Sequence, residues 1–327
     1  SLPRVLALSF SQITLFVMVA FGSMLAPGSI AVFYLAYNLY FVPIGIFGLS
    51  YSVALFPRLS RFSIEHDGAR FFEELFLGIR AILFWVAPSA MMFIVLRAHI
   101  VRVAFGAGLF SWEDTRLTAA SLAVFVIAMG AGSLTILMIR AFYALGRTVI
   151  PLIIDALTLA VSLLFAYGMI YLIKSDAPSS RIIMNMLRIG DLPHGEVIGL
   201  TLGFSVGVFF NAVLLFLALM RVGRALFHLG PVFPYAAVGK ILGASVAAGI
   251  TTYFVRVGFA DVIELRGFVT VLSHGFLSGL CGIGAYAASL YLMRSEDLSG
   301  LLKSLQKKFL RLRVLQGSFD GDIAGGG

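Results

Sequence analysis

Charged residues are scarce in this chain. Aspartate, glutamate, lysine and arginine make up 12% of its 327 residues, whereas they make up about 25% of an ordinary soluble domain. Hydrophobic residues account for 60%, against about 45 to 50% in a soluble domain. A water-soluble fold could not bury this much apolar surface. The composition therefore excludes a soluble enzyme and indicates a polytopic membrane protein.

Cysteine and catalytic motifs are scarce as well. Cys281 is the only cysteine, which excludes a disulfide framework and a paired-cysteine metal site. The sequence contains no HExxH motif, and its five histidines are scattered singly: His66, His99, His194, His228 and His274. We therefore expect neither an enzyme nor a metal or cofactor site. His274 lies in an apolar run, where a lone histidine is more typical of hydrogen-bonded packing than of a ligand.

Long apolar runs make up most of the sequence. About 20 apolar residues in helical form cross the roughly 30 Å hydrocarbon core of a bilayer. Eight stretches reach that length: 5–25, 30–56, 76–96, 117–143, 148–173, 196–220, 236–257 and 267–293. We predict an all-α transmembrane bundle over residues 1–293, with tight hairpins at 26–29 and 145–148. The polar segments 58–74 and 175–193 are expected to lie outside the hydrocarbon.

The C-terminal region has a different composition. Six basic and two acidic residues lie between 294 and 313, with leucine and phenylalanine at helical spacing. This pattern predicts a basic amphipathic helix over 294–315 that binds anionic lipid, followed by a disordered tail over 316–327. We expect no nucleic-acid partner, because the charge directly follows a span. An even number of spans puts both termini on one side, which the positive-inside rule identifies as the cytoplasm.

Charged side chains inside the spans are the first candidates for function. An ionised group at a span centre costs about 2.5 to 3.5 kcal/mol on insertion scales. The charges set clearly within spans, away from their ends, are Arg80, Arg140 and Asp155, of which Asp155 is the only carboxylate. Arg140 and Asp155 either snorkel toward the membrane surface or contact a substrate or coupling ion. Asn211 is expected to be buried against a neighbouring helix.

The second span carries a periodic set of polar, aromatic and small residues. The set is Tyr34, Asn38, Phe41, Gly45, Gly48 and Ser52. Steps of three and four residues put the set on one helix face. Pro43 cannot donate a hydrogen bond to the carbonyl of Leu39, so we expect a bend there, and Pro88 predicts a kink in the third span. Such a bend serves either a substrate cavity or ordinary packing.

Glycines recur every four residues in two other spans. Gly199, Gly203 and Gly207 do so in the sixth span, and Gly275 and Gly279 do so in the eighth. Small residues at this spacing let helix backbones approach closely in membranes. We predict a packing seam in each of these spans.

Several longer motifs resemble the MurJ/MviN lipid II flippases of the wider multidrug/oligosaccharidyl-lipid/polysaccharide exporter superfamily. They are SQI (11–13), GSIAVFYLAYNLYFVPIGIFGLSYSVALFPRLSR (28–61), FGAGLFSWEDT (105–115) and AFYALGRTVIP (141–151). The resemblance is clear over residues 1–151 and continues more weakly through 199–215. It implies that the eight spans correspond to the seventh through fourteenth of a fourteen-span fold, so that an N-terminal lobe is missing upstream.

The resemblance also implies a function. The full protein would move lipid II, the undecaprenyl-pyrophosphate-linked peptidoglycan precursor, across the bacterial cytoplasmic membrane by alternating access, in support of cell-wall biogenesis and cell shape. In the family the last two spans form a groove for the lipid tail, here within 236–293. Two alternatives remain: an exporter of another polyprenyl-linked oligosaccharide or of drugs, and a non-transporting scaffold of cell-wall assembly.

Two positions depart from the family pattern. Tyr37 and Asn38 stand where many members carry an acidic or amide residue followed by arginine, and Met18 stands where some members hold a carboxylate for sodium. Asp155 thus becomes the candidate for coupling to sodium, protons or the membrane potential. The remaining candidate residues form two groups: Gln12, Tyr34, Tyr37, Asn38 and Arg140 for the substrate cavity, and Pro43, Gly45, Gly48 and Pro88 for hinges or kinks.

Overall fold

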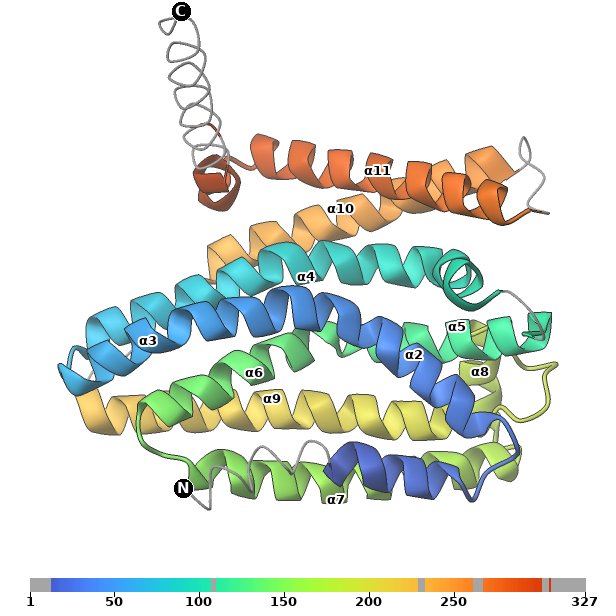
Figure 1. Ribbon diagram of the computed structural model, residues 1–327, viewed down its shortest axis with the longest axis horizontal. Helices are drawn as coiled ribbons and strands as arrows, with labels where there is room; N and C mark the ends of the chain where they lie inside the picture. The colour runs from blue at the N-terminus through green and yellow to red at the C-terminus, as the bar shows by residue number, and fades with distance from the viewer. Residues whose placement is uncertain (1–12, 107–109, 229–232, 261–266, 302–305, 307–327) are drawn as a thin grey trace, which may run out of the picture.

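A computed structural model describes residues 13–106, 110–228, 233–260, 267–301 and 306 of the chain (Figure 1). These residues form helices joined by short turns, with no strand among them. The predicted all-α class is therefore confirmed. Gln12, most of the amphipathic helix predicted over 294–315 and the tail predicted over 316–327 lie outside the described residues.

The helices follow one another with few intervening residues. A ten-residue helix, Ile13–Gly22, comes first. The elements after it are α2 (Ser29–Pro43), the π-helix η1 (Ile44–Leu49), α3 (Ser50–Ile64), α4 (Gly68–Phe105), α5 (Trp112–Ile127), α6 (Met129–Ala144), α7 (Val149–Lys174), α8 (Pro178–Met186), α9 (Val197–Phe227), α10 (Tyr235–Ala260) and α11 (Phe268–Leu292).

Seven of the eight predicted spans have a full counterpart among the described residues. Six helical runs are long and apolar enough to cross a membrane: α2–η1–α3, α4, α7, α9, α10 and α11. The pair α5–α6 makes a seventh and is bent by 47°. Of the first predicted span, 5–25, the structure describes the part from residue 13 onward. The chain is a multi-pass membrane protein.

The bend between α5 and α6 was not predicted from the sequence. It falls at Ala128, directly before Met129 and the two glycines Gly130 and Gly132. Glycine lowers helix stability by about 1 kcal/mol relative to alanine. A Cβ on Gly132 would lie 2.5 Å from the hydroxyl of Tyr40, so the small residue after the bend lets α6 approach α2.

Several helices extend beyond the hydrocarbon length that the sequence predicted. Helix α4 has 38 residues, against the expected range 76–96, and the polar segment 58–74 is helical on both sides of a turn at 65–67. Asp67 caps α4 by accepting a hydrogen bond from the amide of Arg70 at 3.1 Å. The segment 175–193 contains the short helix α8.

The bundle has three groups of helices (Figure 1). Helices α7 and α9 pack together at one side, and α10 and α11 pack together at the other. Between them lie α2, α3, α4, α5 and α6, with α10 and α11 resting on α4. Met18 is fully buried in this bundle.

Candidate functional site

A cavity of about 540 Å³ lies between α2, α6, α7 and α9. Most of its wall is apolar, and the polar side chains in it come from these helices and from the N-terminal helix. They are Thr14, Tyr37, Tyr40, Thr135, Arg140, Tyr143, Asp155, Thr158 and Asn211. A concave, mainly apolar space with a few convergent polar groups is the usual form of a ligand site.

A polar cluster joins α7 to α9 at the wall of this cavity. The side-chain amide of Asn211 donates to Oδ1 of Asp155 at 2.8 Å and to Oγ1 of Thr158 at 2.8 Å. Asn211 is 4% exposed, and Asp155 is half-buried. The amide oxygen of Asn211 is buried with no hydrogen-bond partner among the described residues. This oxygen is free to accept a bond from a ligand.

The helix geometry explains why these three residues meet. Asp155 and Thr158 are three positions apart and so share a face of α7. The glycines at 199, 203 and 207 hold α9 against that face, because a Cβ on Gly203 would lie 2.5 Å from the Cβ of Ala166. Asn211 follows one turn later and therefore reaches across to Asp155.

Aromatic side chains form the α2 side of the cavity. The ring of Tyr37 lies 6.0 Å from Phe41 and 5.6 Å from Phe204, measured between centroids. Tyr40 is 3% exposed and its ring lies 5.4 Å from Phe125. Offset and edge-on ring pairs at these distances are favourable and hold the wall in one shape.

The π-helix η1 lies in the middle of the second span, directly after Pro43. One extra residue in a helical turn rotates the remainder of the helix by about 100°. Tyr34 and Asn38 are consequently exposed, whereas Gly48 and Ser52, which the 3.6-residue period places on the same face, are buried. A Cβ on Gly48 would lie 3.1 Å from the Cα of Ser133 on α6.

The structure separates the predicted site residues. Tyr37, Arg140 and Asp155 line the cavity. Tyr34 and Asn38 lie on the exposed face of α2, outside the cavity wall, and Gln12 lies outside the described residues. Asn211 was predicted to be buried, but its bond to Asp155 was not predicted, because nothing in the sequence gives the register between α7 and α9.

The predicted hinge residues also occupy different settings. Pro43 ends α2 where the π-helix begins. A Cβ added at Gly45 would lie 3.8 Å from the ring of Phe41, which is an ordinary contact distance. A Cβ added at Gly48 would lie 3.1 Å from Ser133 on α6, which is a tight one. Pro88 is buried inside the continuous helix α4. The α2–η1–α3 run is thus the place where proline and π-helical geometry coincide.

Oxygen ligands are the groups that the cavity offers to a cation. Asp155, Thr158 and Asn211 supply a carboxylate, a hydroxyl and an amide oxygen, which suit a hard cation. Among the described residues no three His, Cys, Asp or Glu side chains converge on one point. The cavity therefore has one carboxylate at its polar end rather than a multi-carboxylate metal cage.

Comparisons with known proteins agree on one family. The family model described as lipid II flippase MurJ matches residues 1–260. The probable lipid II flippase MurJ of Thermotoga maritima is 30% identical over 168 residues, which cover 50% of this chain and 34% of that protein. The probable lipid II flippase MurJ of Buchnera aphidicola subsp. Schizaphis graminum is 27% identical over 312 residues, 94% of this chain and 54% of that protein.

A solved structure supports the same assignment of the fold. The chain resembles a structure titled lipid II flippase MurJ, inward closed conformation, with a TM-score of 0.63 and 22% identity over 87% of this chain and 53% of that one. The chain spans between about a third and about half of the length of these relatives. Because the family model matches well over half of its residues, the chain belongs to the MurJ lipid II flippase family.

Proposed function

We propose that this chain is the second lobe of a transporter that moves lipid II across the bacterial cytoplasmic membrane. Family membership supports this proposal, and the chain corresponds to about half of the relatives that it matches over most of its length. The transported molecule is the polyprenyl-pyrophosphate-linked precursor of peptidoglycan. The protein changes the position of this lipid and not its covalent structure, so it acts as a transporter and not as an enzyme.

The observation that carries the proposal is the polar cluster on the cavity wall. A carboxylate and a buried amide oxygen without a partner among the described residues lie between α7 and α9, inside two membrane-spanning helices. Polar groups at that depth are costly and mark substrate or ion pathways. In transporters built from repeated lobes, such sites lie where the lobes rock around a central cavity.

Asp155 is the proposed site of energy coupling. Its carboxylate would accept a proton or bind sodium, with Thr158 and Asn211 supplying further oxygen atoms. Either event changes the charge on the cavity wall and thus favours one conformation over another. Coupling to the membrane potential is the alternative, because a charge that moves across 100 mV gains about 2.3 kcal/mol.

Tyr34 and Asn38 are proposed to face the substrate. They are exposed on α2 within an apolar span, where a carboxamide facing lipid would be costly. We place them at the passage between this lobe and the N-terminal lobe, facing the substrate. Replacement of Asn38 by Leu should lower transport several-fold without loss of membrane insertion; unchanged transport would make Asn38 a packing residue.

The orientation of the lobe follows from its loop charges. Lysine and arginine accumulate on the side of the chain ends, largely in residues 294–313, and such loops stay in the cytoplasm. We therefore propose that both ends of this chain are cytoplasmic. The α3–α4 turn then also lies in the cytoplasm.

Complementation tests the proposed function. The full-length gene should restore growth and cell shape to a bacterium depleted of its own lipid II flippase. Failure of a well-expressed and correctly inserted protein would contradict the proposal. Vesicles reconstituted with purified protein then separate the alternatives: transport of another polyprenyl-linked oligosaccharide but not of lipid II would indicate a different exporter, and transport of neither would indicate a scaffold.

A further inference from the structure

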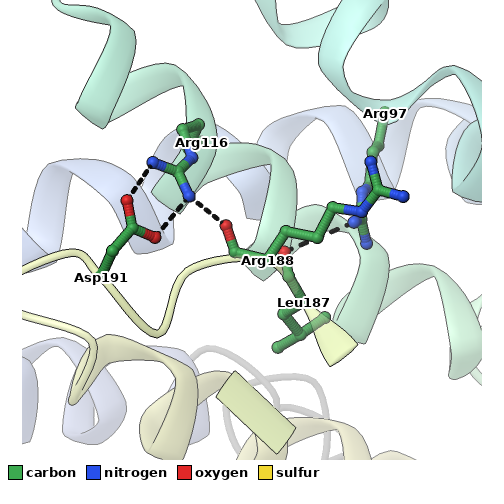
Figure 2. A network of polar contacts seen from close by, with 5 residues as sticks. All are labelled: Arg97, Arg116, Leu187, Arg188 and Asp191. Carbon is green, nitrogen blue, oxygen red and sulfur yellow. Dashed lines mark hydrogen bonds and ion pairs between the residues drawn. The ribbon is translucent and has the colours of Figure 1, made fainter. Parts of the chain in front are cut away.

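Arginines from three separate segments meet at the end of the bundle opposite the α3–α4 turn. Arg97 lies near the end of α4, Arg256 near the end of α10, and Arg188 in the connection between α8 and α9. The side chain of Arg188 extends toward that of Arg97 (Figure 2). The charged groups that act on Arg97 are Arg188 and Arg256, both positive. We call these three residues the arginine cluster.

Backbone carbonyls hold two members of the cluster in place. Arg97 donates to the carbonyl of Leu187 at 3.5 Å (Figure 2), and Arg256 donates to the carbonyl of Val95 at 3.2 Å. A guanidinium has five N–H donors, so each of these side chains retains most of its donors. The side chain of Arg188 makes no hydrogen bond or ion pair with any residue that the structure describes.

Arg116 lies nearby and, unlike the members of the arginine cluster, has a carboxylate partner among the described residues. Arg116 makes a two-pronged ion pair with Asp191, at 2.7 Å and 2.6 Å, and also donates to the carbonyl of Arg188 (Figure 2). That contact fixes the backbone at Arg188, which has a left-handed φ of 60°. Within the described ranges no carboxylate lies within 4.0 Å of a cluster member. The three cations therefore converge without an ion pair to any carboxylate that the structure describes.

The cluster lies at the expected level of the membrane surface. On α4, sixteen uncharged residues (81–96) separate Arg80 from Arg97. On α10, fifteen uncharged residues (241–255) separate Lys240 from Arg256. At 1.5 Å per residue each pair is about 25 Å apart, close to the roughly 30 Å thickness of the hydrocarbon core. Arg97 and Arg256 thus lie where the phosphate groups of lipids begin.

We propose that Arg97, Arg188 and Arg256 form a binding site for a phosphate group, and that this phosphate belongs to a membrane lipid. Arginine matches phosphate because its planar donors bond two oxygens at once. A phosphate oxyanion would neutralise the mutual repulsion of the three cations and use their remaining donors. The site lies at the membrane surface opposite the one at which the C-terminal basic residues are expected. The proposal does not depend on which molecule the protein transports.

Arg188→Gln is the sharpest test, because this side chain makes no hydrogen bond or ion pair with the described residues that the substitution would remove. Purified full-length protein would be stripped of lipid and titrated with phosphatidylglycerol, with bound lipid counted by native mass spectrometry. We expect about tenfold weaker binding by this variant, the effect of losing one charge-assisted bond. The matched control is Arg181→Gln on α8, which removes an arginine paired with its own Asp176 and should bind normally.

A second experiment distinguishes binding of a lipid phosphate from binding of free phosphate. Lipid-free protein would be titrated with inorganic phosphate and with pyrophosphate, with thermal stability as the readout. Weak, variant-independent effects of both salts support the lipid assignment. Saturable binding of a free anion that Arg188→Gln abolishes would support the phosphate site and overturn its assignment to a lipid. Equal phosphatidylglycerol binding by wild type and Arg188→Gln, or equal losses in Arg188→Gln and Arg181→Gln, would overturn the site itself.

Discussion

Two helix pairs, α7–α9 and α4–α11, use glycine differently. In α9 the glycines at 199, 203 and 207 face α7 so closely that an added Cβ would lie less than 3 Å from atoms of α7. In α11 the glycines at 275 and 279 face α4 instead, where an added Cβ would meet its nearest atoms at 3.4 Å and 3.8 Å. The predicted seam is confirmed in α9, whereas in α11 the same spacing gives ordinary contact.

Polar contacts, rather than close approach at these glycines, join α11 to α4. Tyr286 on α11 donates to the carbonyl of Phe84 at 2.7 Å. His99 and His274 lie 3.0 Å apart between ring nitrogens, and His274 also contacts the carbonyl of Arg256. As the sequence suggested, His274 is thus a hydrogen-bonded packing residue. The α7–α9 contact is thus fixed by shape and the α4–α11 contact by directional bonds.

Replacement of Gly203 by Ala should produce the largest effect. The new Cβ would lie 2.6 Å from the carbonyl oxygen of Ser162 and 2.7 Å from the Cα of Ala166, and backbone atoms cannot move aside. Overpacking of this kind costs about 1 to 3 kcal/mol, and we expect the upper end, measured by thermal unfolding in detergent. Gly279→Ala is the matched control and should be neutral or slightly stabilising. Equal losses in both variants would remove the distinction between the two pairs.

Replacement of Asp155 by Asn should change transport more than stability. The asparagine keeps the size of the side chain and its bond from Asn211, but it cannot carry the charge. We expect transport by reconstituted full-length protein to fall about tenfold and to lose its dependence on the coupling ion or potential, with the melting temperature nearly unchanged. Unaltered coupling would mean that Asp155 only snorkels toward the membrane surface.

Replacement of Asp297 by Asn should weaken the α4 contact of the segment after α11. Asp297 accepts from Arg80 at 2.9 Å, and the two side chains are 19% and 24% exposed. Loss of this partly buried pair should cost about 1 to 2 kcal/mol in thermal unfolding. Glu296→Gln is the control, because Glu296 is 3.6 Å from Arg80 and 88% exposed, so its loss should be close to neutral. A larger loss in the control would show that Glu296 is the main partner.

The Arg116–Asp191 contact, at the α8–α9 connection, should have the smallest effect. The hydrogen bond from Arg116 holds the pKa of the Asp191 carboxyl below its usual range. The pair therefore contributes at pH values above the ordinary aspartate pKa of about 3.9, and its contribution is lost as the pH falls through the lower folded value. Wild type and Asp191→Asn should differ slightly in melting temperature at pH 7 and converge in strong acid. A difference that persists there would contradict this assignment.

The sequence predicted those features that depend on length and composition. Apolar runs located the spans because the hydrocarbon thickness imposes a fixed helix length. Asp155 was identified because it is the one carboxylate set clearly within a predicted span, where a charge is costly. The bend at Ala128 and the π-helix at 44–49 escaped prediction because they depend on how α6 packs against α2. Asn211 was expected to be buried, but its partner depends on the fit between α7 and α9.

The π-helix makes the number of residues in the second span more important than their identity. Tyr40, Ile44, Gly48 and Ser52 are all buried, and this spacing of four residues exceeds the 3.6 of an α-helix. Removal of one residue within 44–49 would restore α-helical phase and rotate α2 by about 100° relative to α3, taking its buried stripe out of contact. Apart from Gly48, where an added Cβ would press on Ser133 of α6, the segment should therefore tolerate apolar substitutions but not insertions or deletions, which a scan of membrane insertion and transport would reveal.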